Sequence, residues 1–131
     1  MNATEQILVI ASSRESGHPG DFITSFISCA AIDRKNDIVV VIPTYNEREN
    51  ISCLIDKIRN LPISIDILVV DDNSPDETAQ AVEECIARHS GIYLLKRPGK
   101  SGLGSAYKSG FSFALAHGWK YICQMDADLS H

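Results

Sequence analysis

The fold is decided by the stretch DIVVVIPTYNE at residues 37–47. Its apolar run at residues 38–42 is unbroken, as expected for a central strand that is covered on both faces, and Pro43 is predicted to end it. Directly afterwards, apolar residues recur at the i, i+3, i+4, i+7 spacing of an amphipathic helix: Ile51, Leu54, Ile55 and Ile58. A buried strand followed at once by such a helix predicts β-α-β units and a parallel sheet.

The same alternation continues to the end of the chain. The further predicted strands lie at residues 65–70, 92–95 and 121–125, and a helix lies at residues 103–117. Another helix is predicted to begin at Ser74, because Ser74, Pro75 and Glu77 fit the N-cap, first helical and capping-box positions. The chain from residue 37 onward therefore predicts an α/β fold with a mostly parallel central sheet.

The first 36 residues do not share this alternation. Two parts are therefore predicted: an N-terminal extension of unknown role at residues 1–36 and the α/β part at residues 37–131. Within the extension, Ile7 to Ile10 is predicted as a short strand and Phe22 to Ile32 as a short helix. Neither element suggests a function.

The composition limits the possible functions. The 131 residues suffice for one globular domain, and a formal net charge of −5 argues against nucleic acid as a partner, because such binding depends on neutralising phosphates. The four cysteines form no C-x-x-C pair, which argues against a zinc site or a disulfide framework and favours a cytoplasmic location. No run approaches the roughly 20 apolar residues that span a bilayer, so any membrane contact would be peripheral.

Polar residues cluster wherever a predicted parallel strand ends. PTYNE at residues 43–47 follows the first strand, DDNS at residues 71–74 follows the second, and DAD at residues 126–128 follows the last. In an open parallel sheet, ligands bind outside the carboxyl ends of the strands. The three clusters therefore predict one site at one edge of the sheet.

The cluster Asp126-Ala127-Asp128 suggests a metal site. Two carboxylates at positions i and i+2 after a strand can share one hard cation, Mg²⁺ or Mn²⁺, while phosphate oxygens occupy its other coordination positions. The cation would neutralise charge on a departing diphosphate. On the motif alone, two aspartates that begin a turn explain the pattern equally well.

The other two clusters allow structural and functional interpretations. Adjacent aspartates in an extended chain point to opposite sides, so only one of Asp71 and Asp72 is expected to face the site, and the other could accept backbone amides. Thr44 and Glu47 fit a capping box, which would account for Glu47 without a ligand. Tyr45 could stack on a base or be a half-buried aromatic residue at the edge of the sheet.

A basic, glycine-rich loop, RPGKSGLG at residues 97–104, precedes the last predicted helix. It matches neither the Walker pattern nor the dinucleotide fingerprint, because other residues replace a glycine or lysine that each requires. Backbone amides and positive charge at a helix start can still attract a diphosphate. Alone, the loop is a weak signal.

Four segments occur in a characteristic order: VIPTYNEREN at residues 41–50, VVDDNSPD at 69–76, RPGKSGLGSAY at 97–107 and MDADLSH at 125–131. This ordered set resembles family 2 glycosyltransferases and, more narrowly, the polyprenyl (dolichyl) phosphate mannosyltransferases. The resemblance covers residues 38–131. It implies the GT-A fold, a Rossmann-like nucleotide-diphospho-sugar transferase fold, of which this chain would be the N-terminal half.

The resemblance implies a set of substrate-binding residues. They are Pro43, Tyr45, Glu47, Val70, Asp72, Asp126, Ala127 and Asp128. The first five would surround the guanosine, and the last three would hold the metal and the diphosphate. Asp126 and Asp128 would be the metal ligands and would act in catalysis through the metal, Mg²⁺ or Mn²⁺. Glu77 stands where the family more usually has glycine, and little effect is expected because glutamate suits a helix start.

The implied reaction is transfer of mannose from GDP-mannose to a polyprenyl or dolichyl phosphate, with inversion at the anomeric carbon. A phosphate nucleophile is already ionised near neutral pH, so no general base is required. Members of the family continue with further strands and sometimes membrane helices. The chain is therefore expected to be truncated after the Asp-x-Asp motif, and the full-length protein to contact the cytoplasmic face of a membrane.

Three alternatives remain open. Another family 2 transferase would use a different donor, such as UDP-glucose. A truncated, non-catalytic fragment would bind a nucleotide sugar without turnover. A response-regulator-like signalling domain would also place acids at strand ends, but it predicts an acid pair after the first strand, where this chain has residues 43–47.

Overall fold

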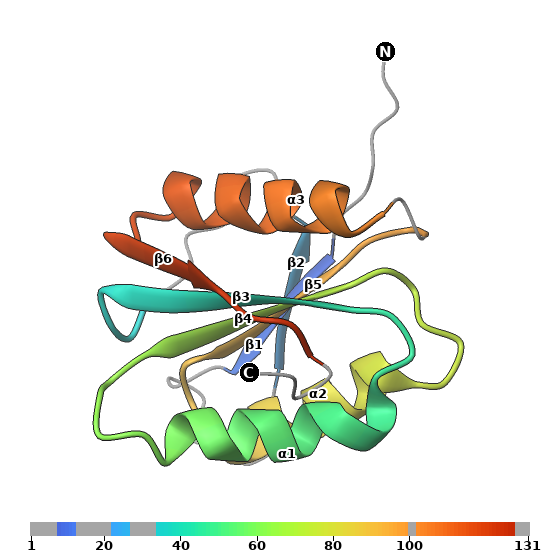
Figure 1. The fold of residues 1–131 in the computed structure, drawn as a ribbon, viewed down its shortest axis with the longest axis horizontal. Coiled ribbons are helices and arrows are strands. Elements are labelled where there is room, and N and C mark those ends of the chain that lie inside the picture. Colours follow the sequence, from blue (N-terminus) through green and yellow to red (C-terminus); the bar gives the residue numbers. More distant parts are fainter. Residues whose placement is uncertain (1–7, 13–21, 27–33, 100–101, 128–131) are drawn as a thin grey trace.

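The computed structural model describes residues 8–12, 22–26, 34–99 and 102–127 (Figure 1). Its elements are, in chain order, β1 (Leu8–Ser12), β2 (Phe22–Phe26), β3 (Ile38–Thr44), α1 (Arg48–Arg59), β4 (Asp66–Asp71), α2 (Thr78–Arg88), β5 (Ile92–Lys96), α3 (Leu103–Ala116) and β6 (Tyr121–Gln124). Of the helices in these ranges, none is long and apolar enough to cross a membrane.

The strands form one six-stranded sheet in the order β2-β1-β5-β4-β3-β6. β6, β3, β4 and β5 run parallel, whereas β1 pairs antiparallel with both β5 and β2. The strands predicted in the second half of the chain match β4, β5 and β6 to within one residue at each end, and the predicted last helix matches α3 equally well. The predicted α/β fold with a mostly parallel sheet is confirmed.

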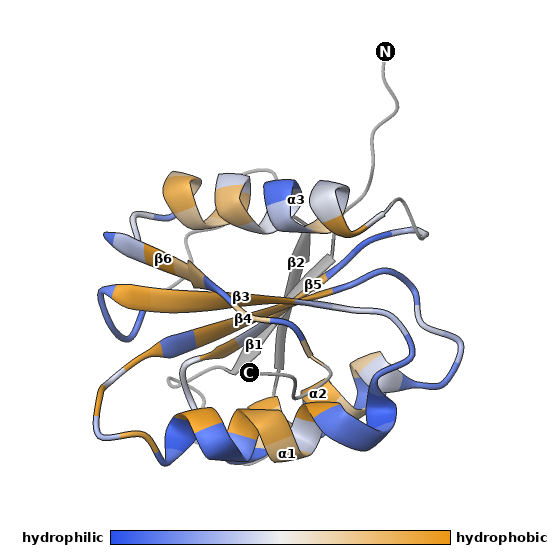
Figure 2. Cartoon of the chain, in the orientation of Figure 1, coloured by the Kyte–Doolittle hydropathy of each residue, from blue (hydrophilic) through white to orange (hydrophobic). Residues whose placement is uncertain are grey.

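Helices cover both faces of the sheet, with α1 and α2 on one side and α3 on the other (Figure 1). Val40 and Ile42 of β3 belong to the core cluster beneath α1 and α2, whereas Val39 and Val41 belong to the cluster beneath α3. Figure 2 shows α1 with apolar residues toward the sheet and hydrophilic residues outward. The unbroken apolar run therefore has the two-sided burial that the sequence predicts.

α3 approaches the sheet closely at Gly110. A Cβ atom at this position would collide with Cγ1 of Val41 and lie 3.1 Å from Cγ2 of Val70. Glycine is therefore required for this approach, because any side chain would push the helix away. The close packing places the start of α3 beside the carboxyl ends of β3 and β4.

Pro43 does not end the first parallel strand as predicted, because β3 continues to Thr44. The carbonyl of Val41 accepts a hydrogen bond from the Met125 amide at 3.1 Å, and the pairing of β3 with β6 stops at Val41 and Gln124. Pro43 lies two residues further along the strand, so its backbone nitrogen points toward the β6 side, as the backbone groups of Val41 do. Its missing N–H therefore interrupts no ladder with β6, and proline is tolerated within the strand.

The helix predicted from Phe22 to Ile32 is wrong over its first part. Residues 22–26 form β2, which pairs antiparallel with β1. Phenylalanine, isoleucine and threonine suit a strand once a neighbouring strand offers a ladder. Residues 27–32 lie outside the described ranges. The strand predicted at Ile7 to Ile10 is confirmed from Leu8 onward.

Candidate functional site

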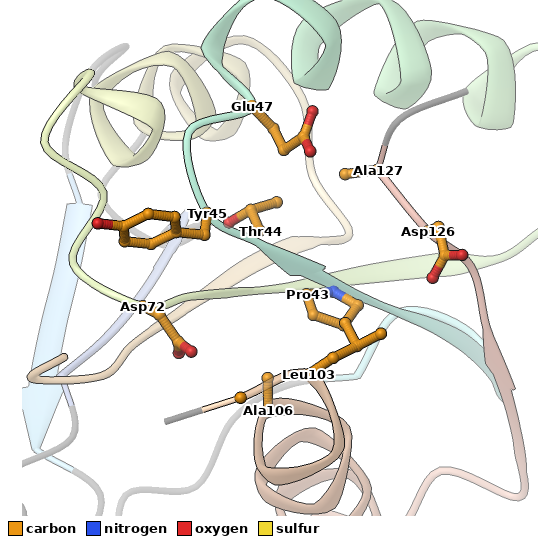
Figure 3. A pocket seen from close by; sticks show the side chains of 10 residues that line it. Pro43, Thr44, Tyr45, Glu47, Asp72, Leu103, Ala106, Asp126 and Ala127 are labelled. Atoms are coloured by element: carbon orange, nitrogen blue, oxygen red, sulfur yellow. The ribbon is translucent and has the colours of Figure 1, made fainter. Parts of the chain in front are cut away.

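A pocket of about 260 Å³ opens at the carboxyl edge of the sheet (Figure 3). It lies where β3, β4 and β6 end and α3 begins. Its lining residues are Pro43, Thr44, Tyr45, Glu47, Asp72, Gly102, Leu103, Ala106, Asp126 and Ala127. The three polar clusters that the sequence places at one edge thus all contribute to one pocket.

The pocket brings together most of the residues predicted to bind substrate. Those that line it are Pro43, Tyr45, Glu47, Asp72, Asp126 and Ala127. Val70 does not line it, because its side chain is fully buried in the core beneath α3. Asp128 lies outside the described residues.

The chain leaves β3 through Thr44 and Tyr45 and turns at Asn46, whose φ of 58° is left-handed. The Thr44 hydroxyl donates to Oδ1 of Asp71 at 2.7 Å, which ties the end of β3 to the end of β4. Tyr45 is 36% exposed and stands in the pocket wall rather than in the core. An exposed aromatic ring at a pocket wall can stack on a planar ligand.

The two adjacent aspartates at the end of β4 have different environments: Asp71 is the last residue of the strand, and Asp72 directly follows it. Asp71 accepts hydrogen bonds from the Ser74 amide at 3.0 Å and the Ser74 hydroxyl at 2.6 Å, so it shapes the turn after the strand. Asp72 instead lines the pocket. The prediction that one aspartate faces the site while the other accepts a backbone amide is confirmed.

Asp72 is paired with Arg97 from the basic loop. The Nε atom of Arg97 lies 3.1 Å from Oδ1 of Asp72, and each side chain is only 6% exposed. Arg97 also donates to the hydroxyls of Ser105 at 2.9 Å and Ser109 at 3.3 Å. A buried carboxylate needs such a partner, because an isolated buried charge is costly. Sequence reasoning missed this pair, although an aspartate at the end of a buried strand suggests a nearby cation.

Asp126 follows β6 and is half-buried in the pocket wall. The hydroxyl of Tyr107, from α3, donates to Oδ1 of Asp126 at 2.7 Å. The next residue, Ala127, is buried in the core cluster beneath α1 and α2, which sets the direction of the chain after Asp126. Sequence reasoning missed Tyr107, because its contact with Asp126 exists only once α3 has packed on the sheet.

Neither of the predicted capping boxes forms. α2 begins at Thr78 rather than at Ser74, whose hydroxyl donates to Asp71 and accepts the Asn46 amide at 3.0 Å. Thr44 likewise donates to Asp71 and does not cap α1. Both hydroxyls join the ends of β3 and β4, because the buried Asp71 carboxylate lies between them.

Asp76 and Thr78, at the start of α2, accept backbone amides at the starts of both helices instead. Asp76 accepts the amides of Arg48 at 3.1 Å and Thr78 at 3.0 Å, and the Thr78 hydroxyl accepts the Glu47 amide at 3.0 Å. Burial raises the pKa of Asp76, but the hydrogen bonds from Thr78 and the Arg48 amide together outweigh it, so the pKa is lowered. The hydrogen bond from the Glu47 amide to the Thr78 hydroxyl holds Glu47 at the pocket through its backbone.

Glu77, which precedes α2, has a left-handed φ of 69°. This conformation favours glycine, because a Cβ atom crowds the backbone there. We expected glutamate to have little effect at this position because it suits a helix start. In the structure, however, Glu77 does not have a helical backbone conformation. The glycine that is more usual in the family therefore has a conformational reason.

Carboxylate oxygens are the ligands that Mg²⁺ and Mn²⁺ prefer. Asp126 presents its carboxylate to the pocket, and Figure 3 shows Asp126 and Asp72 on opposite sides of Pro43. Among the described residues, no group of three or more His, Cys, Asp or Glu side chains could hold a metal ion. A metal at this pocket would therefore need ligand atoms in addition to the described side chains.

Comparison with known proteins identifies relatives of the chain. The sequence matches the family model described as glycosyl transferase family 2 over residues 39–131. It is 42% identical over 94 residues to polyprenol monophosphomannose synthase of Mycolicibacterium smegmatis, covering 71% of this chain and 36% of that protein. It is 39% identical over 94 residues to undecaprenyl-phosphate mannosyltransferase of Micrococcus luteus, covering 72% of this chain and 39% of that protein.

A third relative is dolichol-phosphate mannosyltransferase of Pyrococcus furiosus, which is 40% identical over 96 residues that cover 72% of this chain and 26% of that protein. The chain thus spans about a quarter to two fifths of the length of the curated relatives it matches.

The fold is also similar to a solved structure, mannosyltransferase PcManGT from Pyrobaculum calidifontis in complex with GDP-Man and Mn²⁺. The TM-score is 0.57 at 26% sequence identity, and the match covers 60% of this chain and 24% of that chain. Together with the parallel sheet, this similarity confirms the predicted GT-A fold. Because the family match extends over most of the sequence, the chain belongs to glycosyltransferase family 2.

Proposed function

We propose that this chain is the donor-binding part of an inverting transferase that moves mannose from GDP-mannose to a polyprenyl or dolichyl phosphate. The proposal is supported by the family and by relatives whose names pair mannose with such lipid phosphates. The observation that carries it is the pocket, whose wall contains six of the residues that the family resemblance implies.

In this proposal, the pocket separates nucleoside binding from phosphate binding. Pro43, Tyr45 and Glu47 bind the guanosine, with the exposed ring of Tyr45 stacked on the base. Asp72 contacts the nucleoside from the carboxyl end of the neighbouring strand, β4. The role expected of Val70 stays a prediction, since its side chain is buried in the core.

The charges around the pocket explain why a cation would be needed. Arg97 balances the charge of Asp72, and the wall of the pocket also carries the carboxylates of Asp126 and Glu47. A diphosphate is itself anionic and would be repelled by them. Asp126 and Asp128 would hold Mg²⁺ or Mn²⁺, which neutralises charge on the departing GDP when bound.

The chain needs no general base in this reaction, because a phosphate acceptor is ionised near neutral pH. Its residues bind the donor and orient the diphosphate for displacement at the anomeric carbon. We also propose that residues 37–131 form this donor-binding part, with residues 1–36 as an extension of open role. We further propose that the transfer takes place at the cytoplasmic face of a membrane.

Calorimetric titration of the chain with GDP-mannose, GDP and UDP-glucose, each with and without Mn²⁺, tests the proposal. We expect Mn²⁺-dependent binding of both guanine ligands and weaker binding of UDP-glucose. Asp126→Ala should abolish the Mn²⁺ dependence. Asp56→Ala is the matched control, because it removes the same charge from an exposed position on α1 and should bind as the wild type does.

Other results would favour the alternatives. Tighter binding of UDP-glucose than of GDP-mannose would indicate another donor. Binding of GDP-mannose without turnover on a polyprenyl phosphate would indicate a non-catalytic fragment. A folded chain that binds none of the three ligands would contradict the proposal.

A further inference from the structure

We infer that Tyr107 is a positioning residue that orients the Asp126 carboxylate toward a divalent cation and so sets how tightly the pocket holds that cation. The inference rests on the proposed function, because it takes Asp126 as a metal ligand. It adds a residue of α3 that acts on the cation only through another side chain.

The contact between these two residues is short. The Tyr107 hydroxyl donates to Oδ1 of Asp126 at 2.7 Å. Leu103 and Ala106 of the same helix line the pocket, whereas Tyr107 is not among the lining residues. Tyr107 therefore reaches the wall of the pocket through its hydrogen bond to Asp126.

α3 holds the Tyr107 ring in place. The ring packs on that of Phe111, one turn further along the helix, with 5.9 Å between the ring centroids and 35° between the ring planes. Both rings pack against the core cluster beneath α3. Packing of this kind limits the rotamers of the tyrosine and keeps its hydroxyl directed at Asp126.

The helix is anchored on both sides of Tyr107. Arg97 donates to Ser105, which precedes Tyr107, and to Ser109, which follows it. Gly110 then allows the helix to lie directly against the sheet. The hydroxyl is therefore held by the tertiary structure before any ligand binds.

The chemical consequence concerns the orientation of the carboxylate. A hydrogen bond to one oxygen of an aspartate restricts rotation about its terminal torsion, which is otherwise broad. Groups that hydrogen-bond to a ligating carboxylate typically contribute about 10- to 100-fold to metal affinity. Loss of the Tyr107 hydroxyl should therefore weaken the cation site without removing it.

Titration of Mn²⁺ into the chain at saturating GDP, followed by the EPR signal of free Mn²⁺, tests the inference. We expect Tyr107→Phe to weaken Mn²⁺ binding by about tenfold. Its thermal midpoint and its affinity for guanosine, which has no phosphate, should not change. In an Asp126→Ala background, Tyr107→Phe should have no further effect on Mn²⁺ binding.

Tyr121→Phe is the matched control, because it removes the hydroxyl of an exposed tyrosine on β6 and should bind Mn²⁺ as the wild type does. If Tyr107→Phe binds Mn²⁺ normally while Asp126→Ala does not, the inference is overturned and the proposed function stands. Equal weakening of Mn²⁺ and guanosine binding would indicate a general structural role and would also overturn it. A wild-type chain that takes up no Mn²⁺ would overturn both.

Discussion

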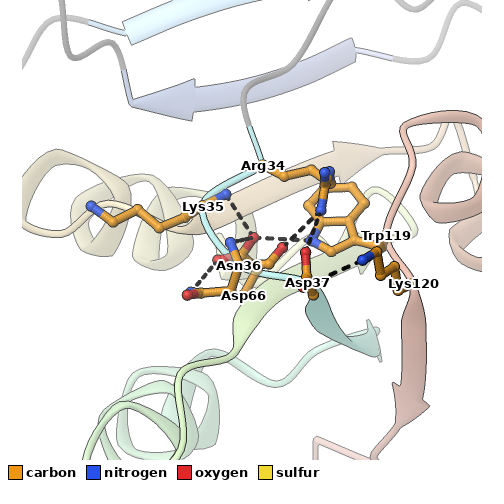
Figure 4. Close-up of polar contacts among 7 residues, drawn as sticks. All are labelled: Arg34, Lys35, Asn36, Asp37, Asp66, Trp119 and Lys120. Atoms are coloured by element: carbon orange, nitrogen blue, oxygen red, sulfur yellow. Dashed lines mark hydrogen bonds and ion pairs between the residues drawn. The ribbon is translucent and has the colours of Figure 1, made fainter.

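β4 has a buried aspartate at its start and another just beyond its end, Asp66 and Asp72. Asp66 lies at the amino edge of the parallel strands, where the groups of the described residues that donate hydrogen bonds to it are uncharged (Figure 4). The donors are the backbone amides of Lys35 and Asn36, the side chain of Asn36 and the indole of Trp119, each at 2.9 Å. Asp72 lies at the opposite edge, in the pocket.

The comparison separates a structural carboxylate from one at a ligand site. Burial raises the pKa of Asp66, and the hydrogen bonds from Asn36 and Trp119 oppose this only in part. Those donors belong to the segment before β3 and to the segment after α3. By accepting hydrogen bonds from both, Asp66 holds the two segments together at the amino edge of the sheet. Asp72 has a guanidinium partner, Arg97, at the edge where parallel sheets bind ligands. Burial alone therefore does not identify a functional carboxylate. The groups that pair with the carboxylate, and the edge of the sheet at which it lies, do identify it.

Removal of the guanidinium should have the largest effect. Arg97→Met leaves Asp72 buried without this cation and should lower the free energy of unfolding by about 3 to 5 kcal/mol. It also removes the hydrogen bonds to Ser105 and Ser109 on α3. Chemical denaturation of the variant measures the loss.

The double variant Arg97→Met/Asp72→Leu is the control for this prediction. Replacing both charges by apolar side chains of similar size should recover most of the stability. Binding of GDP should nevertheless be weaker than in the wild type, because Asp72 is absent. A single Arg97→Met variant as stable as the wild type would contradict the distinction between the two aspartates.

At the amino edge, Asp66→Ala should lower the free energy of unfolding by roughly 2 to 3 kcal/mol, because several buried donors lose their acceptor. Asp66→Asn should cost less. The side-chain carbonyl of the new asparagine can accept the three hydrogen bonds that Oδ2 of Asp66 accepts. The side-chain amide of Asn36 can flip so that its oxygen faces the new NH₂ group. GDP binding by either folded variant should equal that of the wild type, and a loss of binding would contradict a purely structural role.

The two edges should also respond to pH with opposite signs. The pKa of Asp66 is raised above its ordinary 3.8, so the stability from this group is fully present below that value and is lost as pH rises through the folded-state pKa. The pKa of Asp76, at the carboxyl edge, is lowered, so its contribution is present above the ordinary value and is lost as pH falls through the folded-state pKa. Denaturation over a pH series, with Asp66→Asn and Asp76→Asn as references, measures the contribution of each aspartate to stability. If both contributions changed with pH in the same direction, the opposite roles given to the two groups would be contradicted.

Backbone strain gives the smallest expected effect. At the carboxyl edge, Glu77 has a left-handed backbone conformation. At the amino edge, the same conformation occurs at Gly91 and Gly118, where glycine adopts it without strain. Glu77→Gly should raise the free energy of unfolding by about 0.5 kcal/mol, because relief of roughly 1 kcal/mol of strain exceeds the added entropy of the unfolded chain. The exposed ion pair with Arg48 contributes little. Glu77→Ala loses this ion pair but keeps the strain, so it should not be more stable than the wild type in thermal denaturation.

Local sequence patterns predicted the parallel sheet and the location of the pocket. The apolar run at residues 38–42 and the helical spacing that follows it are properties of neighbouring residues, so they can be recognised without the fold. The rule that ligands bind at the carboxyl ends of parallel strands then placed Tyr45, Asp72 and Asp126 at one edge. Strand direction sets the shared edge, and the adjacency of β4, β3 and β6 in the sheet groups the three residues in one pocket.

The partners of the buried polar groups were decided by the tertiary structure. Arg97 meets Asp72, and Tyr107 meets Asp126, only after α3 has packed on the sheet, so no local pattern contains these pairs. The starts of α1 and α2 lie side by side, and Asp76 therefore bonds across to α1 where the sequence predicts separate capping boxes. The strand at residues 22–26 likewise depends on the ladder that β1 offers. Periodicity is set by neighbours in the chain, whereas a buried donor or acceptor pairs with whichever group packing brings within reach.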